Sequence, residues 1–176
     1  MQLDLYKNFF TSYFQDTTVV KQISESIDLL KNKKRIFFIG NGGSNSICSH
    51  MMEDYGKIAG YKSYAFSDAS LITCYANDFG YEHAIAEWLK LHMEGEDVLV
   101  AISSSGNSKN IINAVAEAKS KGCDVISLSG FKPDNELRKT GNVNFYLPVE
   151  NYGIVECYHQ IILHVVLDEL ALIRKK

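Results

Sequence analysis

Four serines stand close together in the run Ser103-Ser104-Ser105-Gly106-Asn107-Ser108, directly after a short apolar stretch and before a helical pattern. Serine hydroxyls and backbone N–H groups at such a turn can satisfy several oxygens of a phosphate monoester, while the helix dipole offsets its charge. The alternative interpretation is serine N-capping beside a flexible loop. A single serine would suit that alternative, but four hydroxyls with a glycine favour a phosphate site.

A second loop, Gly40-Asn41-Gly42-Gly43-Ser44, follows another apolar run and also opens a helical segment. Glycine N–H groups and a helix N-terminus around one point attract an anion. The loop is not a P-loop, which ends in Gly-Lys-Ser/Thr, and it lacks the third glycine of a dinucleotide fingerprint. A tight turn and a ligand site therefore both remain open for it.

Titratable side chains follow the glycine loop on the same helical segment. Glu53 and Asp54 lie three and four residues after His50, so both acids share one helical face with the histidine. Such a group can bind a metal ion, or it can supply an acid and a base.

The last helical segment carries a second titratable group. Glu156, Gln160 and His164 recur at steps of four, and His159 lies about one turn from Glu156, which predicts a polar stripe on an otherwise apolar helix. Together the two helices offer two histidines and two carboxylates, enough for a zinc site or for acid–base work, and the sequence leaves both possibilities open.

Other side chains that could take part in chemistry are assigned structural roles. His83 and His92 are expected on the surface or as satisfied core residues. Tyr81, Trp88 and Tyr158 are predicted to pack in the protein interior rather than to stack on a sugar.

The elements that position these loops alternate between strand and helix. Apolar, β-favouring runs predict strands within KKRIFFIGNGGS, Lys62–Phe66, DVLVAISSSGNS, CDVISLSG and VNFYLPV. Helical segments follow Ser44 and occupy Tyr81–Met93 and Lys109–Lys121. This βαβ rhythm predicts an α/β three-layer sandwich with a five-stranded parallel sheet, whose ligands bind beyond the carboxyl ends of the strands.

Helices are also expected at both ends of the chain. Leu3–Leu30 has the apolar spacing of two helices, and Gly153–Arg174 reads as one long closing helix. The apolar face predicted for the closing helix is Ile161, Val165, Leu167, Leu170 and Leu172. Because no linker or repeat interrupts the chain, residues 1–176 are expected to form a single domain.

Composition excludes several classes of protein. Hydrophobic residues make up 46% and charged residues 22% of the 176 residues, which excludes disorder for most of the length. The formal charge of −3 argues against nucleic-acid binding. Four separated cysteines, no signal-like segment and no apolar run near the roughly 20 residues of a membrane span indicate a cytoplasmic protein with reduced thiols and no membrane partner.

The segments GNGGS, FSDASLITCYANDFGYEH and GEDVLVAISSSGNSKNI, with the Glu156/His164 helix, together resemble the sugar isomerase (SIS) domain family, and within it the phosphoheptose isomerases. The likeness runs from about Lys34 to the C-terminus. It implies a flavodoxin-like fold with residues 1–31 as a helical arm packed on the domain or on a neighbouring subunit. It also implies a homotetramer with sites between subunits.

The resemblance further implies aldose–ketose isomerisation of a ring-opened sugar phosphate through an enediol. The implied reaction interconverts sedoheptulose 7-phosphate and a heptose 7-phosphate for a cell-surface polysaccharide, lipopolysaccharide or capsule. Zinc is implied as the cofactor, and no nucleotide is needed.

Carried over position by position, the resemblance assigns roles to particular residues. The implied substrate and phosphate contacts are Asn41, Gly42, Gly43, Ser44, Asp54, Asn77, Asp78, Ser103, Ser104, Ser105, Ser108 and Glu156. The implied zinc ligands are His50, Asp54, Glu156 and His164. The implied catalytic residues are Asp54 or Glu156, which would move the proton, and His164, which would protonate or polarise the oxygen.

Three departures from the family pattern keep alternatives open. Asp54 stands where the family has Glu, Glu156 stands where it usually has Gln, and Lys57 replaces an arginine. The base is therefore Asp54, the neighbouring Glu53 or Glu156, and the extra charge predicts either tighter metal binding or a relocated base. A non-catalytic SIS scaffold that binds a replication initiator and a phosphosugar sensor are the competing functions.

Overall fold

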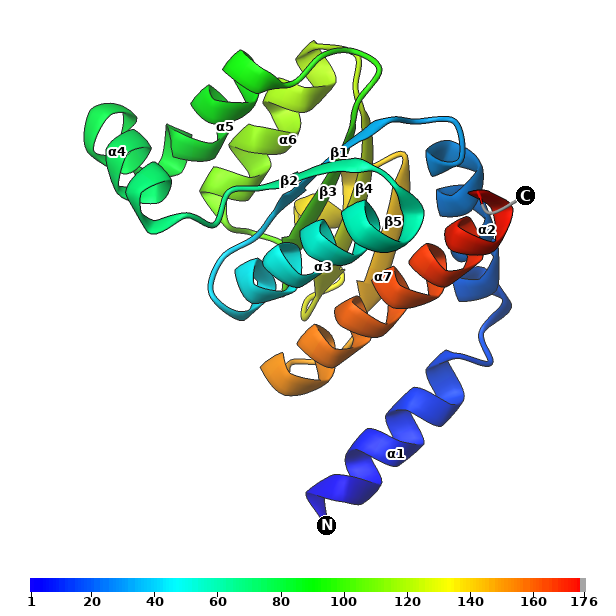
Figure 1. Ribbon diagram of the computed structural model, residues 1–176. Coiled ribbons are helices and arrows are strands. Elements are labelled where there is room, and N and C mark those ends of the chain that lie inside the picture. The colour runs from blue at the N-terminus through cyan, green and yellow to red at the C-terminus, as the bar shows by residue number, and fades with distance from the viewer. Residues whose placement is uncertain (175–176) are drawn as a thin grey trace.

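A single parallel sheet organises the chain, which we describe for residues 1–174 from a computed structural model (Figure 1). Its strands are β1 (Arg35–Ile39), β2 (Lys62–Ala65), β3 (Val98–Ser103), β4 (Asp124–Gly130) and β5 (Val143–Leu147). They lie in the order β2-β1-β3-β4-β5 and all pair in parallel. The predicted five-stranded α/β sandwich is confirmed.

Helices cover both faces of the sheet (Figure 1). One face is covered by α2 (Thr17–Leu30), α3 (Gly43–Ala59) and α7 (Tyr152–Arg174). The other is covered by α5 (Tyr81–His92) and α6 (Lys109–Ser120), with α4 (Ala69–Phe79) lying against α5. A short 3₁₀ turn, η1 (Leu137–Lys139), precedes β5.

Each strand contributes to two apolar layers because successive side chains point to opposite faces of a sheet. In β1 the ring of Phe38 packs edge-on against Tyr55 of α3, with centroids 5.2 Å apart. The next ring, Phe37, packs against Trp88 of α5 at 5.5 Å. Both phenylalanines are fully buried, so the strand must carry an uninterrupted apolar run, which is the pattern read from the sequence.

The first helix, α1 (Gln2–Tyr13), extends away from the sandwich (Figure 1). With α2 it confirms the two helices predicted near the N-terminus. Phe9, Phe10 and Tyr13 are partly buried against the core, whereas Leu3 is 66% and Leu5 45% exposed. The tip of α1 therefore presents apolar side chains that its own chain does not cover.

The closing helix is confirmed, but its predicted apolar face is partly wrong. Ile161, Val165 and Leu172 are exposed, while Leu167 and Leu170 are buried. The face that meets the sheet instead runs through Val155, Tyr158, His159, Ile162, Leu163 and Val166. The buried face is rotated about the helix axis by about one residue position from the predicted face. Because α7 is apolar over much of its circumference, the periodicity of its apolar residues does not define which face is buried.

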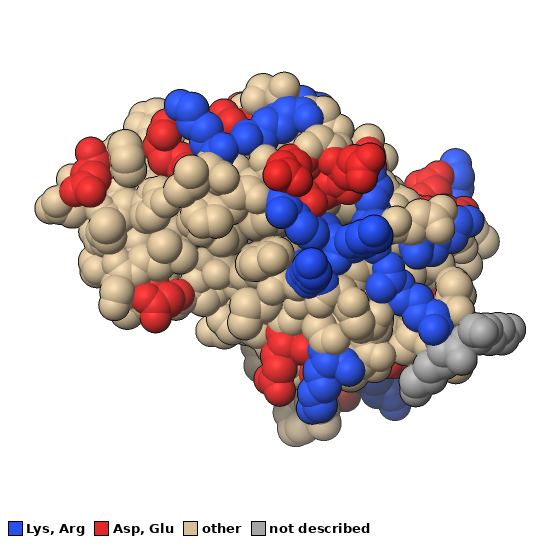
Figure 2. Space-filling view, turned by 45° about the horizontal axis from the view of Figure 1, so that its top comes forward, with Lys and Arg blue, Asp and Glu red and all other residues tan. Residues whose placement is uncertain are grey.

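Charged side chains of both signs lie side by side on the face shown in Figure 2. Near the amino ends of the strands, Arg35 makes a two-pronged contact with the buried carboxylate of Asp97, at 2.6 and 2.8 Å. Lys33 pairs with Asp124 at 2.8 Å. Within the described residues, no helix has both the length and the apolarity to cross a membrane.

Candidate functional site

The serine loop joins β3 to α6 as a closed turn. Ser103 ends the strand, Ser108 is the N-cap residue of the helix, and the Ser103 hydroxyl donates to that of Ser108 at 3.2 Å. The N–H of Gly106 donates back to the Ser103 hydroxyl at 3.2 Å. Gly106 has a φ of +67°, and a Cβ there would clash with Asn135. The glycine is required because the turn is left-handed and packed from behind.

This loop forms one wall of a cavity of about 150 Å³ at the carboxyl end of the sheet. Its lining residues are Asn41, Ser44, Ile102, Ser103, Ser104, Ser105, Ser108, Tyr152 and Glu156. None of these is Lys or Arg, so an anion here would be held by hydroxyl and backbone donors. The Ser104 hydroxyl is buried and has no hydrogen-bond partner among the described residues, which leaves it free for a ligand oxygen.

The glycine loop places Asn41 beside the same cavity. Gly42, with φ +54°, caps the start of α3. The carboxamides of Asn41 and Asn110 donate to each other at 2.9 and 2.8 Å, and the Tyr81 hydroxyl donates to Asn41 at 2.8 Å. These three side chains also line a smaller cavity of about 130 Å³. Asn41 is thus fixed in orientation between the two cavities.

Two aromatic predictions are confirmed and one is wrong. Trp88 and Tyr158 are buried in the core, as predicted. Tyr81 is 55% exposed and makes a polar contact at the site, because it is the first residue of α5 and faces the glycine loop. His83 is exposed, as expected, and His92 lies against the carbonyl oxygen of Trp88 at 2.8 Å.

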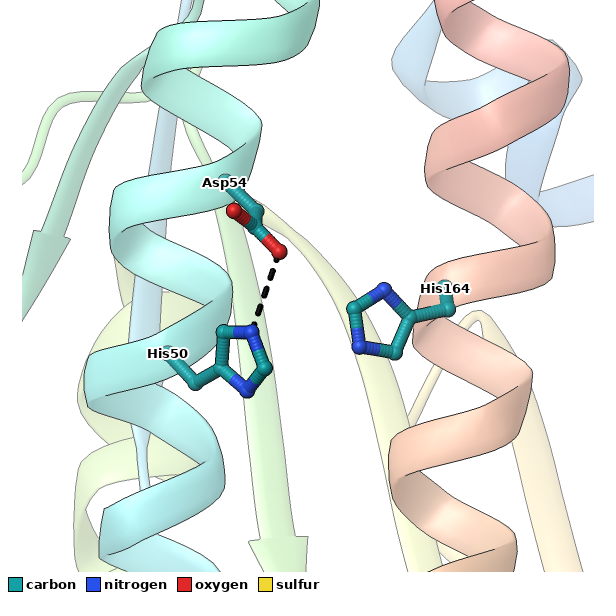
Figure 3. Close-up of side chains that lie close together, drawn as sticks. All are labelled: His50, Asp54 and His164. Carbon is teal, nitrogen blue, oxygen red and sulfur yellow. Dashed lines mark ion pairs between the residues drawn. The ribbon is translucent and has the colours of Figure 1, made fainter.

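Two histidines and a carboxylate from α3 and α7 point toward one another (Figure 3). His50 Nε2 lies 3.1 Å from Asp54 Oδ2, and the ring of His164 is 5.1 Å from that of His50. One donor atom from each of the three side chains lies within 4.8 Å of the others. Two imidazoles and a carboxylate are ligands that zinc accepts, so these residues fit a metal ion.

Gln160 lies between the two imidazoles of this cluster. Its Nε2 is 2.8 Å from His50 Nδ1 and 3.2 Å from His164 Nε2. No other carboxamide among the described residues contacts both rings. The polar stripe predicted on α7 is therefore present for Gln160 and His164.

Glu156 lies apart from the three-residue cluster. Its carboxylate packs so closely on Gly43, at the start of α3, that any Cβ at that position would collide with it. It lines the serine cavity and also an open groove of about 520 Å³ that contains His50 and Gln160. Glu156 therefore lies where the serine cavity meets the groove that contains His50.

The remaining predicted residues lie outside the serine cavity. Asn77 and Asp78 are exposed near the end of α4, where the Asn77 amide donates to Asp78 at 2.8 Å. Glu53 is also exposed and lies 3.9 Å from Lys57. Within one chain, the structure does not bring these side chains to the serine cavity.

His159 is a correction to the predicted polar stripe. It is fully buried on the sheet side of α7, with Nε2 3.3 Å from the carbonyl oxygen of Ser129. Burial lowers the pKa of His159 to about 4, so the imidazole is neutral near pH 7. It is a core residue, separate from the cluster of His50 and His164.

Sequence reasoning missed Asn110 and Tyr152, which line the cavities. Asn110 is in the first turn of α6, and that turn necessarily faces the preceding serine loop, so its position carried a usable signal. Tyr152 opens α7 and is 62% exposed, and only the packing of α7 on α3 and β4 reveals its place.

Comparison with known proteins gives consistent results. The sequence profile described as the SIS domain matches residues 15–130. A phosphoheptose isomerase of Histophilus somni (strain 2336) is 34% identical over 96% of this chain and 91% of its own. One of Proteus mirabilis (strain HI4320) is 33% identical over 93% and 88%.

A solved structure shares the fold. The phosphoheptose isomerase of Neisseria gonorrhoeae superposes with a TM-score of 0.86 over 96% of this chain and 95% of that chain, at 24% sequence identity.

Proposed function

Since the chain belongs to the SIS domain family, we propose that it is a sugar-phosphate isomerase that interconverts an aldose and a ketose. The proposed substrate pair is sedoheptulose 7-phosphate and a heptose 7-phosphate, because its relatives at 33–34% identity are phosphoheptose isomerases. Their coverage of nearly the whole chain does not favour the scaffold or sensor alternatives.

One observation carries the proposal: a cavity lined with hydroxyl donors meets a cluster of acid–base side chains through Glu156. The cavity suits the phosphate end of an open-chain sugar. The cluster suits the carbonyl end, where the proton must move. A binding module would need the first feature but not the second.

The proposed mechanism assigns one task to each group. Ser103, Ser104, Ser105 and Ser108 hold the phosphate, with Asn41, Gly42, Gly43 and Ser44 beside it. A carboxylate, Asp54 or Glu156, removes a proton from one carbon to give the enediol and returns it to the adjacent carbon. His164 gives a proton to the carbonyl oxygen as the other hydroxyl gives one up, so the reaction needs no redox partner.

In the metal-bound form, His50, Asp54 and His164 would hold a zinc ion, so His164 would help to polarise the carbonyl oxygen rather than protonate it, and Glu156 would be the carboxylate left to act as the base. When bound, zinc supplies Lewis acidity that polarises the substrate oxygens. The observation that supports zinc is the donor set itself, two imidazoles and a carboxylate within reach of one another.

We further propose a homotetramer with active sites between subunits, with residues 1–31 as an arm that packs on the domain or on a neighbour. Asn77 and Asp78 are exposed and lie outside their own chain's serine cavity, so we assign them to substrate contacts at such an interface. The proposed location is the cytoplasm, and the proposed product feeds synthesis of a heptose-containing surface polysaccharide.

The test compares turnover of sedoheptulose 7-phosphate by the wild type and by His164→Ala. Loss of acid–base catalysis should reduce kcat by about 10²–10⁴-fold. The matched control is His83→Ala, an exposed histidine on α5 that lines neither cavity, and it should leave kcat unchanged. Full activity in a folded His164→Ala protein would refute the assignment.

A further inference from the structure

The two packed helices α3 and α7 place their polar side chains at different levels. Glu156 contacts Gly43 in the first turn of α3, whereas Gln160 contacts His50, seven residues further along. Seven helical residues span about 10 Å along the axis. Glu156 and the histidine cluster are therefore about two turns of α3 apart.

The Glu156 carboxylate is also stabilised electrostatically in its observed position. It lies at the N-terminal end of α3, where the helix dipole favours a negative charge. A carboxylate that left this position to join the cluster would give up that interaction.

Gln160 occupies the position next to both imidazoles, with contacts of 2.8 Å to His50 and 3.2 Å to His164. A carboxamide offers a donor and an acceptor, and a rotation of 180° about its last bond exchanges them. Both contacts are made by the same terminal atom of the side chain, so in the rotated state the carboxamide oxygen accepts from an N–H of each imidazole and leaves the other ring nitrogen of each free to bind a metal ion. Hydrogen bonds of this kind fix the orientation and tautomer of metal-binding histidines.

We propose that Gln160, and not Glu156, completes the metal site of this chain by orienting His50 and His164, which leaves the Glu156 carboxylate unligated as the base of the isomerisation. The family resemblance assigns a metal ligand to position 156, where relatives usually carry Gln. In this chain the carboxamide stands one turn later on α7. The role of Glu156 rests on the proposed function, whereas the role of Gln160 does not.

Geometry also distinguishes Glu156 from the other two candidate bases. Asp54 lies 3.1 Å from His50 and belongs to the cluster, and Glu53 is 65% exposed beside Lys57. Glu156 is the carboxylate that lines both the serine cavity and the groove containing His50. A sugar whose phosphate lies in the serine cavity would place its chain past this carboxylate.

The test separates metal binding from turnover. Zinc affinity is measured by calorimetry and cobalt(II) binding by visible absorbance, for the wild type, Gln160→Leu, Gln160→Ala and Glu156→Gln. We expect both Gln160 variants to bind metal about 10–100-fold more weakly, and Glu156→Gln to stay within about threefold of the wild type. Cys157→Ser, which alters the same groove, is the matched control and should not change the affinity.

Turnover is then measured at saturating zinc. Glu156→Gln should lose about 10²–10⁴-fold in kcat, while Gln160→Leu should recover most of its activity. Metal affinity lowered by Glu156→Gln but not by the Gln160 variants would overturn the proposal, as would full turnover by Glu156→Gln. If the wild type proved inactive on every sugar phosphate, the proposed function would fail, and the metal measurements would still decide the role of Gln160.

Discussion

At the scale of single residues, the serine cavity is lined by hydroxyl groups and contains no basic side chain. Ser104 is the most informative residue there, because it lines the cavity and its buried hydroxyl lacks a partner among the described residues. The hydroxyl of Ser129 on β4 is also buried and without a partner among the described residues, but Ser129 does not line the cavity. Substituting each serine in turn therefore distinguishes an effect on ligand binding from the effect of removing a buried hydroxyl.

We predict that Ser104→Ala raises the KM for sedoheptulose 7-phosphate about tenfold, because one hydrogen bond to a charged group is worth roughly 1.5–3 kcal/mol. The free energy of unfolding should hardly change, since the hydroxyl makes no internal hydrogen bond. Ser129→Ala should leave KM unchanged. Equal effects of the two substitutions on KM, measured by steady-state kinetics, would remove Ser104 from the phosphate site.

A second residue-scale prediction concerns acid stability. Burial lowers the pKa of His159 from 6.5 to about 4. At pH values between these two, His159 is protonated in the unfolded chain and neutral in the folded chain. The free energy of unfolding should therefore fall as the pH drops from about 6.5 to about 4, by at most about 1.4 kcal/mol per unit from this group.

Urea denaturation at several pH values tests the prediction on His159. His159→Gln should unfold more easily at pH 7 yet show a shallower loss between pH 6.5 and 4, because only the histidine contribution is removed. If the free energy of unfolding of His159→Gln falls as steeply with decreasing pH as that of the wild type, His159 does not cause the acid destabilisation.

At the scale of elements, the contact between α3 and α7 sets the position of Glu156. Gly43→Ala adds a Cβ that collides with the Glu156 carboxylate, so we predict a loss of at least tenfold in kcat. The fold should be retained, since alanine is the more favourable residue within a helix.

The control is Gly60→Ala at the other end of α3. Gly60 has a φ of +73° and open space around it, so this substitution should lower the free energy of unfolding by about 1 kcal/mol while leaving kcat unchanged. Thermal denaturation and kinetics on both variants check the pair. An active Gly43→Ala protein would mean that the position of Glu156 is not critical.

Elements were predictable where local chemistry decides them. All five strands, and the helices α3, α5 and α6, could be read from apolar runs and glycine turns, since strands covered on both faces are mostly apolar. The helix α4 was not predicted. The serine and glycine loops followed from their positions at strand ends. His50, Asp54 and His164 could be grouped because helical spacing places each on one face, and the resemblance paired the two helices.

The predictions that were wrong concern the rotation and position of helices relative to the sheet. The buried face of α7 and the burial of His159 are set by the packing of α7 on β4, which periodicity alone does not encode for a helix with many apolar residues. The distance between Glu156 and the cluster of His50, Asp54 and His164 depends on the position of α7 along the axis of α3, which only the structure gives. Tyr81 was misassigned because an aromatic residue at a helix start can face either the core or a loop.

At the scale of the whole molecule, the exposed apolar tip of α1 bears on assembly. We predict a particle of about four times the chain mass of 19.8 kDa by sedimentation velocity. Leu3→Asp with Leu5→Asp should yield smaller particles with unchanged circular dichroism, because both side chains are exposed in the single chain. A monomeric wild type would contradict the proposed tetramer and its shared sites.

The central claim is that the serine cavity and the histidine cluster together isomerise a sugar phosphate through an enediol. The most direct test incubates zinc-loaded and chelator-treated protein with sedoheptulose 7-phosphate in D₂O and follows the reaction by NMR. We predict an aldose product, deuterium at the carbon that exchanges its proton, and a lower rate after chelation. Binding of the sugar phosphate with neither product nor deuterium would contradict the claim.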